Sequence, residues 1–418
     1  MMTLERFSIG IGDRFARQGE AQLRAFILAA ENGVNITPVW NKSNREHKLV
    51  GTQPASVRAE ADAAVKALGW TKPYRVDADH IALATVDGFI EASDFFTIDV
   101  ADQIGHAAPT EDIDRFIQHA KPLLGTLRVP GIEQPLDVTP RLIEQVARKY
   151  VFAVREAGRI FRHIEQRKGA GRFIAEVSMD ETDSPQTPPE LLLILLALSK
   201  EGVAAQTIAP RFSGRFNKGI DYVGAVGQFA REFADDLAVI AYATKQFGLP
   251  ANLKLSVHSG SDKFSLYPVI RRAVADSGAG LHLKTAGTTW LEELIGLALG
   301  EGDGLRIAKD VYAQAFSRYD ELVAPYASVV DIDLAALPSP DEVSRWNGER
   351  FAEALRHDPS CPRFDRNFRQ LLHVAFRVAA EMKDRYLQAL DGNRAVIAEN
   401  VTGNLFDRHI RPLFLDKD

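Results

Sequence analysis

Cysteine is nearly absent from this chain, because Cys361 is the only one among 418 residues. A single thiol excludes a disulfide within the chain and a metal site built from several thiolates. A reducing compartment is sufficient for such a protein, so we expect it to be cytoplasmic. The amino terminus also lacks a basic segment followed by an apolar one, and no signal peptide is predicted.

Long apolar runs and an excess of positive charge are also missing. The longest apolar run, residues 191–198, is too short to cross a bilayer and follows a Pro-Pro pair, as a buried helix would. The chain has 50 Lys and Arg against 56 Asp and Glu, a formal net charge of -6. Its basic residues form no stripe along the sequence, so we expect neither a membrane nor a nucleic acid as partner.

Short runs of strand-like residues recur along the first 300 positions. We predict strands at 7–12, 35–40, 74–80, 95–100, 172–178, 206–210, 254–258 and 281–284. Helical patterns lie between most of them, at 20–30, 56–68, 139–167, 189–200, 222–247 and 263–275. Eight strands alternating with helices predict an α/β protein whose residues 1–304 form a (β/α)8 barrel of the TIM type.

An open, doubly wound sheet is the alternative architecture. That fold usually carries a glycine fingerprint after its first strand, and here Gly10 and Gly12 supply only the first two glycines. After residue 304 only helical patterns remain, at 305–322, 339–356 and 364–390. We predict that residues 305–418 form a helical extension packed on the barrel. The extension either covers the barrel alone or forms the interface of a homo-oligomer.

Polar side chains gather where the predicted strands end, which is where barrel enzymes keep their active sites. In chain order they are Arg14, Glu46, Asp77, Asp79, His80, Glu176, Asp180, Arg211, Arg215, His258, Lys263, His282 and Lys284. Buried charges at this density cost free energy unless they pair or bind a ligand, so a ligand site is predicted. Each residue alone also has an ordinary explanation, such as capping a helix or lying on the surface.

Two histidines at the ends of consecutive strands indicate a divalent metal ion. His258 and His282 fall on inward positions of their strands, and with Asp79 they would supply nitrogen and oxygen ligands. Such a set suits zinc, manganese, nickel or cobalt. Glu176 or His80 is the reserve ligand. In the alternative interpretation, each histidine only forms a hydrogen bond with a neighbouring carboxylate.

Several longer segments together resemble the tagaturonate epimerase family. They are Gly12-Asp-Arg, Val76-Asp-Ala-Asp-His, Glu176-Val-Ser-Met-Asp-Glu-Thr, Ala209-Pro-Arg-Phe with Gly214-Arg-Phe-Asn-Lys-Gly, His258-Ser-Gly-Ser-Asp-Lys-Phe-Ser, Leu281-His-Leu-Lys-Thr-Ala-Gly-Thr, and Leu405-Phe-Asp-Arg-His-Ile-Arg-Pro-Leu-Phe. The resemblance spans nearly the whole chain. It implies a metal-dependent barrel enzyme that interconverts fructuronate and tagaturonate, two keto-uronates that differ at one hydroxyl-bearing carbon.

Two features depart from this family. The first strand begins within the first ten residues, without the additional amino-terminal segment of family members, and residues 40–51 match the family less closely. Both departures concern loops or ends, which bear on the substrate more than on the reaction class.

The implied substrate limits the chemistry. The carbon to be inverted is β to the ketone and is not next to the carboxylate, so neither group acidifies its C–H bond directly. Oxidation and re-reduction would need a nicotinamide, for which the chain has no convincing fingerprint. Retro-aldol cleavage with re-addition, assisted by a metal ion, is one remaining route, and direct proton exchange by a strong base is the other.

For such a reaction we assign roles to the residues at the strand ends. Glu46 and Asp180, with Glu176 as the third candidate, form the acid–base set. Substrate oxygens or the ketone would be held by Lys263 and Lys284. The carboxylate of the sugar acid would be bound by Arg14, Arg211 or Arg215.

Two other functions are considered. Lys284 is placed where it could form an imine, which would make the chain a Schiff-base aldolase or isomerase acting on another sugar acid or ketose. The chain could also be a barrel that binds a sugar acid without turning it over. The histidines and carboxylates at several strand ends favour catalysis over this last alternative.

Overall fold

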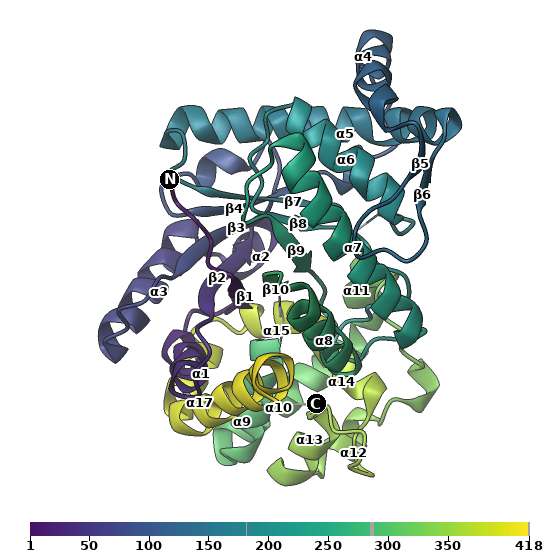
Figure 1. The fold of residues 1–418 in the computed structure, drawn as a ribbon. Helices are drawn as coiled ribbons and strands as arrows, with labels where there is room; N and C mark the ends of the chain where they lie inside the picture. The colour runs from purple at the N-terminus through teal and green to yellow at the C-terminus, as the bar shows by residue number, and fades with distance from the viewer. Residues whose placement is uncertain (181, 285–287, 417–418) are drawn as a thin grey trace.

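Eight parallel strands close into a barrel, which confirms the predicted (β/α)8 architecture (Figure 1). The computed structural model describes residues 1–180, 182–284 and 288–416. Two of the motifs above extend beyond this part, because Glu181 and residues 285–287 lie outside the described residues. The strands are β1 (Phe7–Gly12), β2 (Thr37–Ser43), β3 (Arg75–Ile81), β4 (Phe95–Asp99), β7 (Ile174–Ser178), β8 (Thr207–Ala209), β9 (Lys254–Val257) and β10 (Leu281–Lys284).

The strands pair in chain order, and β10 closes the ring by pairing with β1. The amino-terminal end of the barrel is sealed by a small apolar cluster of Leu4, Val39, Phe95 and Ile174. Lys254 lies at the same end, where its ammonium group donates to the carbonyl oxygens of residues 4–6. In the part of the chain that the structure describes, this packing fills the amino-terminal end of the barrel and leaves its carboxyl end as the place for a ligand.

Helices cover the outside of the barrel as the apolar periodicity predicts. They include α1 (Gly19–Glu31), α3 (Pro54–Leu68), α5 (Pro140–Lys168), α6 (Pro188–Lys200), α7 (Val226–Phe247) and α8 (Tyr267–Ser277). Proline occupies the first turn of α3, α5 and α6, where its missing N–H costs nothing. Helix α6 is buried throughout residues 191–198, because it packs between α5 and α7.

The connection after β4 differs from a simple strand–helix unit. It contains α4 (Thr110–Ala120) and an antiparallel hairpin of β5 (Gly125–Leu127) and β6 (Leu136–Val138) before α5 begins. The sequence prediction missed α4 and the hairpin. The two strands have three residues each, which is too short to show an alternating pattern. Helix α2 (Asn44–Val50), directly after β2, was also missed.

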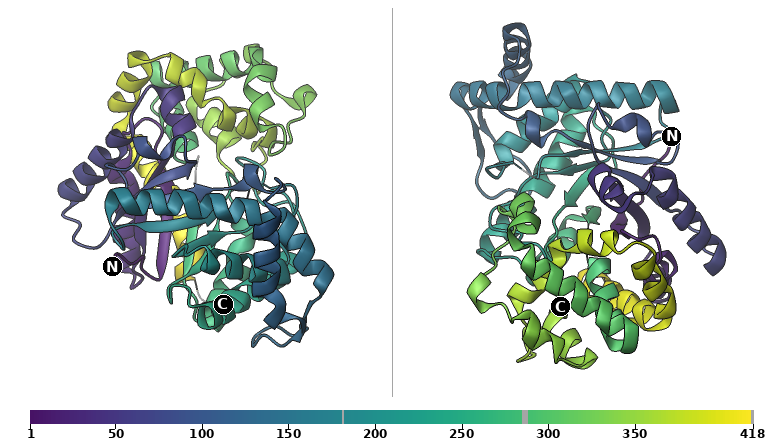
Figure 2. Two further views of the ribbon diagram at one scale, coloured as in Figure 1. Left: turned by 90° about the horizontal axis from the view of Figure 1, so that it is seen from above. Right: turned by 180° about the vertical axis from the view of Figure 1, so that it is seen from behind.

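The helical region forms a second core beside the barrel (Figures 1 and 2). It is built from α9 (Thr288–Leu299), α10 (Gly302–Ser317), α11 (Tyr319–Val323), α12 (Pro340–Ser344), α13 (Gly348–Leu355), α14 (Arg366–Val374), α15 (Phe376–Glu381), α16 (Asp384–Gly392) and α17 (Arg394–Gly403). This core already includes Trp290 in α9, so the boundary predicted at residue 304 falls inside it, in the first turn of α10. The helix predicted at 364–390 is broken into α14, α15 and α16.

The last helix returns to the barrel. This π-helix, η7 (Asn404–Leu415), packs against both α1 and α8, and Leu405, Phe406, Ile410 and Leu413 join the core of the barrel. It therefore occupies the place between the first and last outer helices, where the helix after β10 would lie in a simple barrel. Helix α9, which follows β10 in sequence, belongs to the second core instead.

No helix in the described part of the chain has both the length and the apolar character needed to cross a membrane.

Helices α9 and α17 approach each other closely at Gly296. A Cβ atom at Gly296 would lie 2.5 Å from Cγ1 and 2.7 Å from Cα of Ile397. We expect Gly296→Ala to push the helices apart and to lower the free energy of unfolding by about 1–3 kcal/mol, as overpacking does. Chemical denaturation followed by circular dichroism measures this change.

Gly392→Ala is the matched control, because Gly392 is an exposed residue at the end of α16 and a Cβ there would meet no atom within 4 Å. This control should change the free energy of unfolding by less than about 1 kcal/mol. Equal effects of the two substitutions would contradict a tight contact between α9 and α17.

Candidate active site

A cavity of about 340 Å³ lies at the carboxyl ends of the strands. A second cavity of about 240 Å³ adjoins it, and Asp180, His258 and Tyr326 line both. The first cavity is lined from the barrel by Arg14, Glu46, Asp79, His80 and Lys284, and from the helical region by His373 and Phe376. The structure thus brings most of the predicted site residues to one place.

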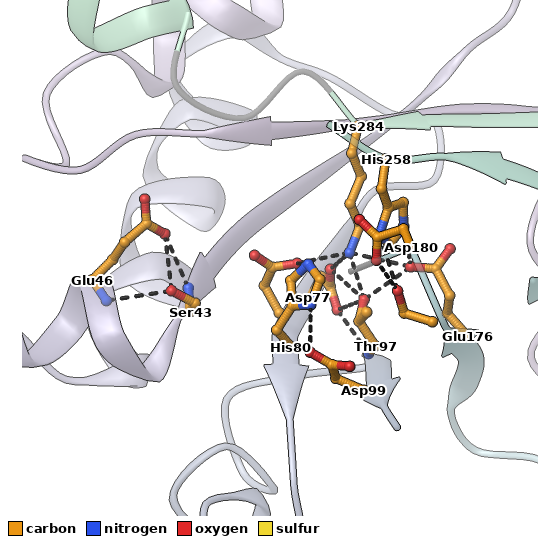
Figure 3. Close-up of polar contacts among 12 residues, drawn as sticks. Ser43, Glu46, Asp77, His80, Thr97, Asp99, Glu176, Asp180, His258 and Lys284 are labelled. Atoms are coloured by element: carbon orange, nitrogen blue, oxygen red, sulfur yellow. Dashed lines mark hydrogen bonds and ion pairs between the residues drawn. The ribbon is translucent and has the colours of Figure 1, made fainter. Parts of the chain in front are cut away.

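Lys284 lies at the centre of the barrel mouth, surrounded by carboxylates (Figure 3). Its Nζ lies 2.8 Å from Oδ2 of Asp77, 2.7 Å from Oδ1 of Asp79 and 3.2 Å from Oε1 of Glu176. It also donates a hydrogen bond of 2.5 Å to Oγ1 of Thr97. Burial lowers the pKa of Lys284, but the three carboxylates outweigh it and raise the pKa well above its usual value.

The carboxylates around Lys284 are not equivalent. Burial raises the pKa of Asp77 to about 7, although Lys284 opposes this shift. Burial also acts on Glu176, but His258 and Lys284 outweigh it and hold the pKa of Glu176 well below its usual value. Glu176 is therefore ionised at neutral pH, whereas Asp77 can carry a proton.

His258, directly after β9, links two carboxylates. Its Nε2 lies 2.7 Å from Oε1 of Glu176, and its Nδ1 lies 3.6 Å from Oδ1 of Asp180. Burial lowers the pKa of His258, but Glu176 outweighs this and the net shift is upward. Asp180 is itself held by a 2.5 Å hydrogen bond from the hydroxyl of Ser178.

His80 reaches the cavity through an irregularity in β3. The pairing of β3 with β4 shifts register between Ala78 and Ile81, and His80 has a φ of +49°, in the left-handed region that non-glycine residues rarely adopt. Its Nδ1 lies 2.9 Å from Oδ2 of Asp99. This contact turns the other ring nitrogen, Nε2, away from Asp99 and toward Asp79, whose Oδ1 lies 3.8 Å from it.

His80, Asp180 and His258 form a candidate cation site. One ligand atom from each of the three lies within 4.8 Å of the others. The donor set consists of two imidazole nitrogens and one carboxylate oxygen, and the carboxylate of Asp99 orients the imidazole of His80 from behind. Such a set fits a divalent transition metal. The set shares only His258 with the predicted ligands Asp79, His258 and His282, and it includes the reserve ligand His80.

His282 lies deeper in the barrel than His258. In the register of β9 and β10, His282 is the partner of Ser256, two residues before His258. The ring is fully buried, its Nδ1 lies 2.8 Å from Oγ of Ser8, and it packs against Phe95. Burial lowers the pKa of His282 to about 3. Asp79 lines the cavity, but its Oδ1 is engaged by Lys284.

Glu46 and Arg14 form a separate part of the cavity wall (Figure 3). Glu46 lies in the first turn of α2, where Ser43 and Glu46 cap each other, and Nε of Arg14 lies 3.0 Å from its Oε1. Burial raises the pKa of Glu46, but Arg14 and the backbone of Ser43 outweigh it and the net shift is downward. The guanidinium of Arg14 packs over the ring of Phe376.

The other predicted substrate-binding residues lie elsewhere. Lys263 is fully buried and lines neither cavity, because its Nζ donates to the oxygens of Ser259 and Ser261 and to the carbonyl of Lys284. It therefore holds the loop after β9 against the end of β10, away from the lining of both cavities. Arg211 and Arg215 line the second cavity. The guanidinium of Arg211 also donates to the carbonyl of Thr182.

Sequence patterns missed several residues of the site. Thr97 and Asp99 lie on a strand that was predicted, but the alternation alone gave no reason to select them. Tyr326, His373 and Phe376 come from the helical region, where aromatic and histidine residues are usually packing residues. No signal in the sequence showed that these helices reach the barrel mouth.

The fold and the site define a class: a (β/α)8-barrel enzyme with a cluster of carboxylates, histidines and a lysine at its mouth. A family model described as "UxaE: tagaturonate epimerase" matches residues 1–395. The chain belongs to the tagaturonate epimerase family, an isomerase family, and the resemblance predicted from the motifs is confirmed.

Known relatives share both sequence and fold. A curated relative, the tagaturonate/fructuronate epimerase of Thermotoga maritima, is 26% identical over 97% of this chain and 80% of its own length. The native crystal structure of fructuronate-tagaturonate epimerase UxaE from Cohnella laeviribosi is 25% identical, with a TM-score of 0.78, over 99% of this chain and 82% of that chain. A glycerol complex of the same enzyme gives a TM-score of 0.80 at 24% identity, over 99% of this chain and 82% of that chain.

The buried amine of Lys263 should make the free energy of unfolding depend on pH. Burial lowers the pKa of Lys263 to about 7, whereas an unfolded lysine has a pKa of about 10.4. Between these values the unfolded chain binds more protons, so this residue should make stability rise with pH by at most about 1.4 kcal/mol per pH unit. Lys263→Met should remove that rise, as measured by urea denaturation at about pH 7 and about pH 9.

Lys245→Met is the control for this measurement, because Lys245 lies exposed on α7. The control should keep the dependence on pH that the original protein has. An unchanged slope in Lys263→Met would contradict a lowered pKa for the buried lysine.

Proposed function

We propose that this chain interconverts fructuronate and tagaturonate at the first cavity. One observation carries the proposal: the cluster of His80, Asp180 and His258 lies beside Lys284 and the carboxylates that surround its ammonium group. Membership of the tagaturonate epimerase family supports the choice of substrate. An enzyme that acts on a six-carbon sugar acid needs a reactive centre and a cationic pocket for the carboxylate. The first cavity offers the reactive centre, and the adjoining second cavity offers the cationic pocket.

The second cavity is the proposed site for the carboxylate of the substrate. Its lining contains four cationic side chains and one acidic side chain, namely Arg45, Arg211, Arg215, Lys218 and Asp180. This excess of positive charge attracts an anion, and guanidinium groups bind carboxylates well. The first cavity has a mixed lining of acids and cations and is the proposed place for the ketone-bearing half.

We assign a divalent metal ion to His80, Asp180 and His258. A bound ion of this kind supplies Lewis-acid stabilisation of negative charge on a substrate oxygen. The three residues line the first cavity, and Asp180 and His258 also line the second, so they face the middle of the proposed substrate. We do not assign Asp79 as a metal ligand, because Lys284 engages its carboxylate. We do not assign His282 either, because it lies deeper in the barrel and does not line the cavity.

Glu46 is the proposed base. It is ionised at neutral pH, lines the first cavity and lies apart from the proposed metal ligands (Figure 3). It would take the proton from the hydroxyl group on the carbon to be inverted. The bond from this carbon to its neighbour beside the ketone would then break, the aldehyde fragment would turn, and the bond would re-form on the other face. Glu46 would return the proton to the new alkoxide.

The surroundings of Lys284 disfavour the Schiff-base alternative. Imine formation needs a neutral amine, whereas three carboxylates hold the ammonium group of Lys284 in its charged form. Lys284 instead fits the role of a fixed positive charge at the cavity floor. Direct proton exchange by Glu46 is the rival mechanism, and incorporation of solvent deuterium at the inverted carbon would identify it.

Removal of metal ions is the first test of this function. After dialysis against a chelator, we expect epimerisation of tagaturonate, followed by NMR, to fall by more than about a hundredfold. Zinc, manganese, nickel or cobalt should restore it. Asp180→Asn should lower both bound metal, measured by elemental analysis, and activity, because it removes a charged ligand.

His163→Ala is the control, since His163 pairs with Asp87 outside the two cavities. It should keep both metal and activity. Full activity of a chelated, metal-free sample would contradict the metal assignment, and absence of turnover in a metal-loaded sample would contradict the epimerase assignment.

The carboxylate site leads to a prediction about salt. Arg215→Met should raise the KM for tagaturonate about three- to thirtyfold at low ionic strength, and by less at high ionic strength, because salt screens an exposed charge. Steady-state kinetics at several salt concentrations measures this effect. Arg231→Met, an exposed position on α7, is the control and should leave KM unchanged. A salt-independent effect of Arg215→Met would argue against an ionic contact.

A further inference from the structure

His373, from the helical region, lines the first cavity without a hydrogen-bond partner among the described residues. It lies in the last turn of α14 and is 3% exposed, and neither Nδ1 nor Nε2 has a partner there. A buried polar atom without a partner costs free energy, so native proteins rarely leave one unpaired. Two such atoms at a cavity wall indicate that a bound molecule supplies their partners.

Two glycines from the barrel loops fix the ring of His373. A Cβ atom at Gly219, after β8, would lie 3.3 Å from Cβ and Cδ2 of His373. A Cβ atom at Gly260, after β9, would lie 3.6 Å from Cε1 of the same ring. The backbones of both loops therefore pack directly against the imidazole, which leaves it little freedom to turn away from the cavity.

His373 is a neutral side chain. Burial lowers the pKa of His373 well below its usual value, and the positive charges of Arg14 and Lys218 lower it further. A neutral imidazole offers one N–H donor and one acceptor nitrogen. This combination matches a hydroxyl group, which can both donate and accept, better than a carboxylate, which only accepts.

Arg14 adds a second donor to the same cavity. Its Nη1 is buried and has no partner among the described residues, while its Nε is engaged by Glu46. Arg14 packs over Phe376, three residues after His373. The wall formed by Arg14, His373 and Phe376 thus combines unused hydrogen-bonding atoms with an apolar surface, as sugar-binding walls do.

We propose that His373 is a substrate-binding residue that holds a hydroxyl group on the ketone-bearing half of the sugar acid. This inference rests on the proposed function, which places that half in the first cavity and the carboxylate in the second. The helical region then contributes directly to substrate recognition. A bound sugar acid would bridge the barrel and the second core through this contact.

The test measures binding and stability separately. Calorimetric titration with an equilibrated mixture of tagaturonate and fructuronate gives Kd, and thermal unfolding of the unliganded, metal-loaded protein gives Tm. His373→Phe should weaken binding about tenfold to hundredfold, because it removes both ring nitrogens. Its Tm should not fall, since no hydrogen bond within the protein is lost. His373→Asn keeps a donor and an acceptor, and it should lose less affinity.

Ionic strength distinguishes a hydroxyl partner from a carboxylate partner. The loss of affinity in His373→Phe should be the same at about 0.02 M and about 0.5 M salt, whereas the loss in Arg215→Met should shrink at high salt. A loss in His373→Phe that shrinks in the same way would overturn the hydroxyl assignment.

Two further outcomes would overturn the inference. Original affinity in His373→Phe would show that the ring does not contact substrate. A large fall in Tm in both His373 variants, with unchanged Kd, would show a structural role. If the original protein neither binds nor epimerises the two keto-uronates, the proposed function itself fails, whereas normal turnover with an unaffected His373→Phe refutes this inference alone.

Discussion

One buried ammonium group organises the mouth of the barrel. Lys284, on β10, contacts carboxylates from β3 and β7 and a hydroxyl from β4, so it connects strands from different sides of the cylinder. Without that charge, three carboxylates at this depth would repel each other and take up protons. Against the effect of burial, Lys284 together with His258 holds the pKa of Glu176 well below its usual value, so Glu176 stays ionised and pairs with His258. The position of His258 in the cation cluster therefore depends on Lys284.

The barrel could be predicted from the sequence because its signal is local. Each strand is a short run of apolar or alternating residues, and each run ends in polar residues that mark the carboxyl end. The level of a side chain along the barrel axis cannot be predicted from a local pattern, because it depends on the register between neighbouring strands. His258 and His282 both point inward, yet the pairing of His282 with Ser256 places them at different levels. The grouping of ligand atoms in the structure, His80 with Asp180 and His258, therefore differs from the predicted set.

Two other features of the site also lie beyond local patterns. His80 takes part because β3 is irregular there and its backbone adopts a left-handed conformation, which no residue type in Val76-Asp-Ala-Asp-His indicates. Tyr326, His373 and Phe376 take part because the second core packs against the barrel mouth. Tertiary packing decides such contacts, and helical periodicity shows only that a buried face exists.

The return of η7 to the barrel makes the two cores mutually dependent. Because this final helix fills the space between α1 and α8, the outer layer of the barrel is completed by residues that follow the second core in sequence. Without η7, the apolar surface between those two helices would be exposed to solvent, at a cost in free energy that grows with the apolar area uncovered. The two ends of the chain, separated by the whole second core in sequence, thus share one layer of packing.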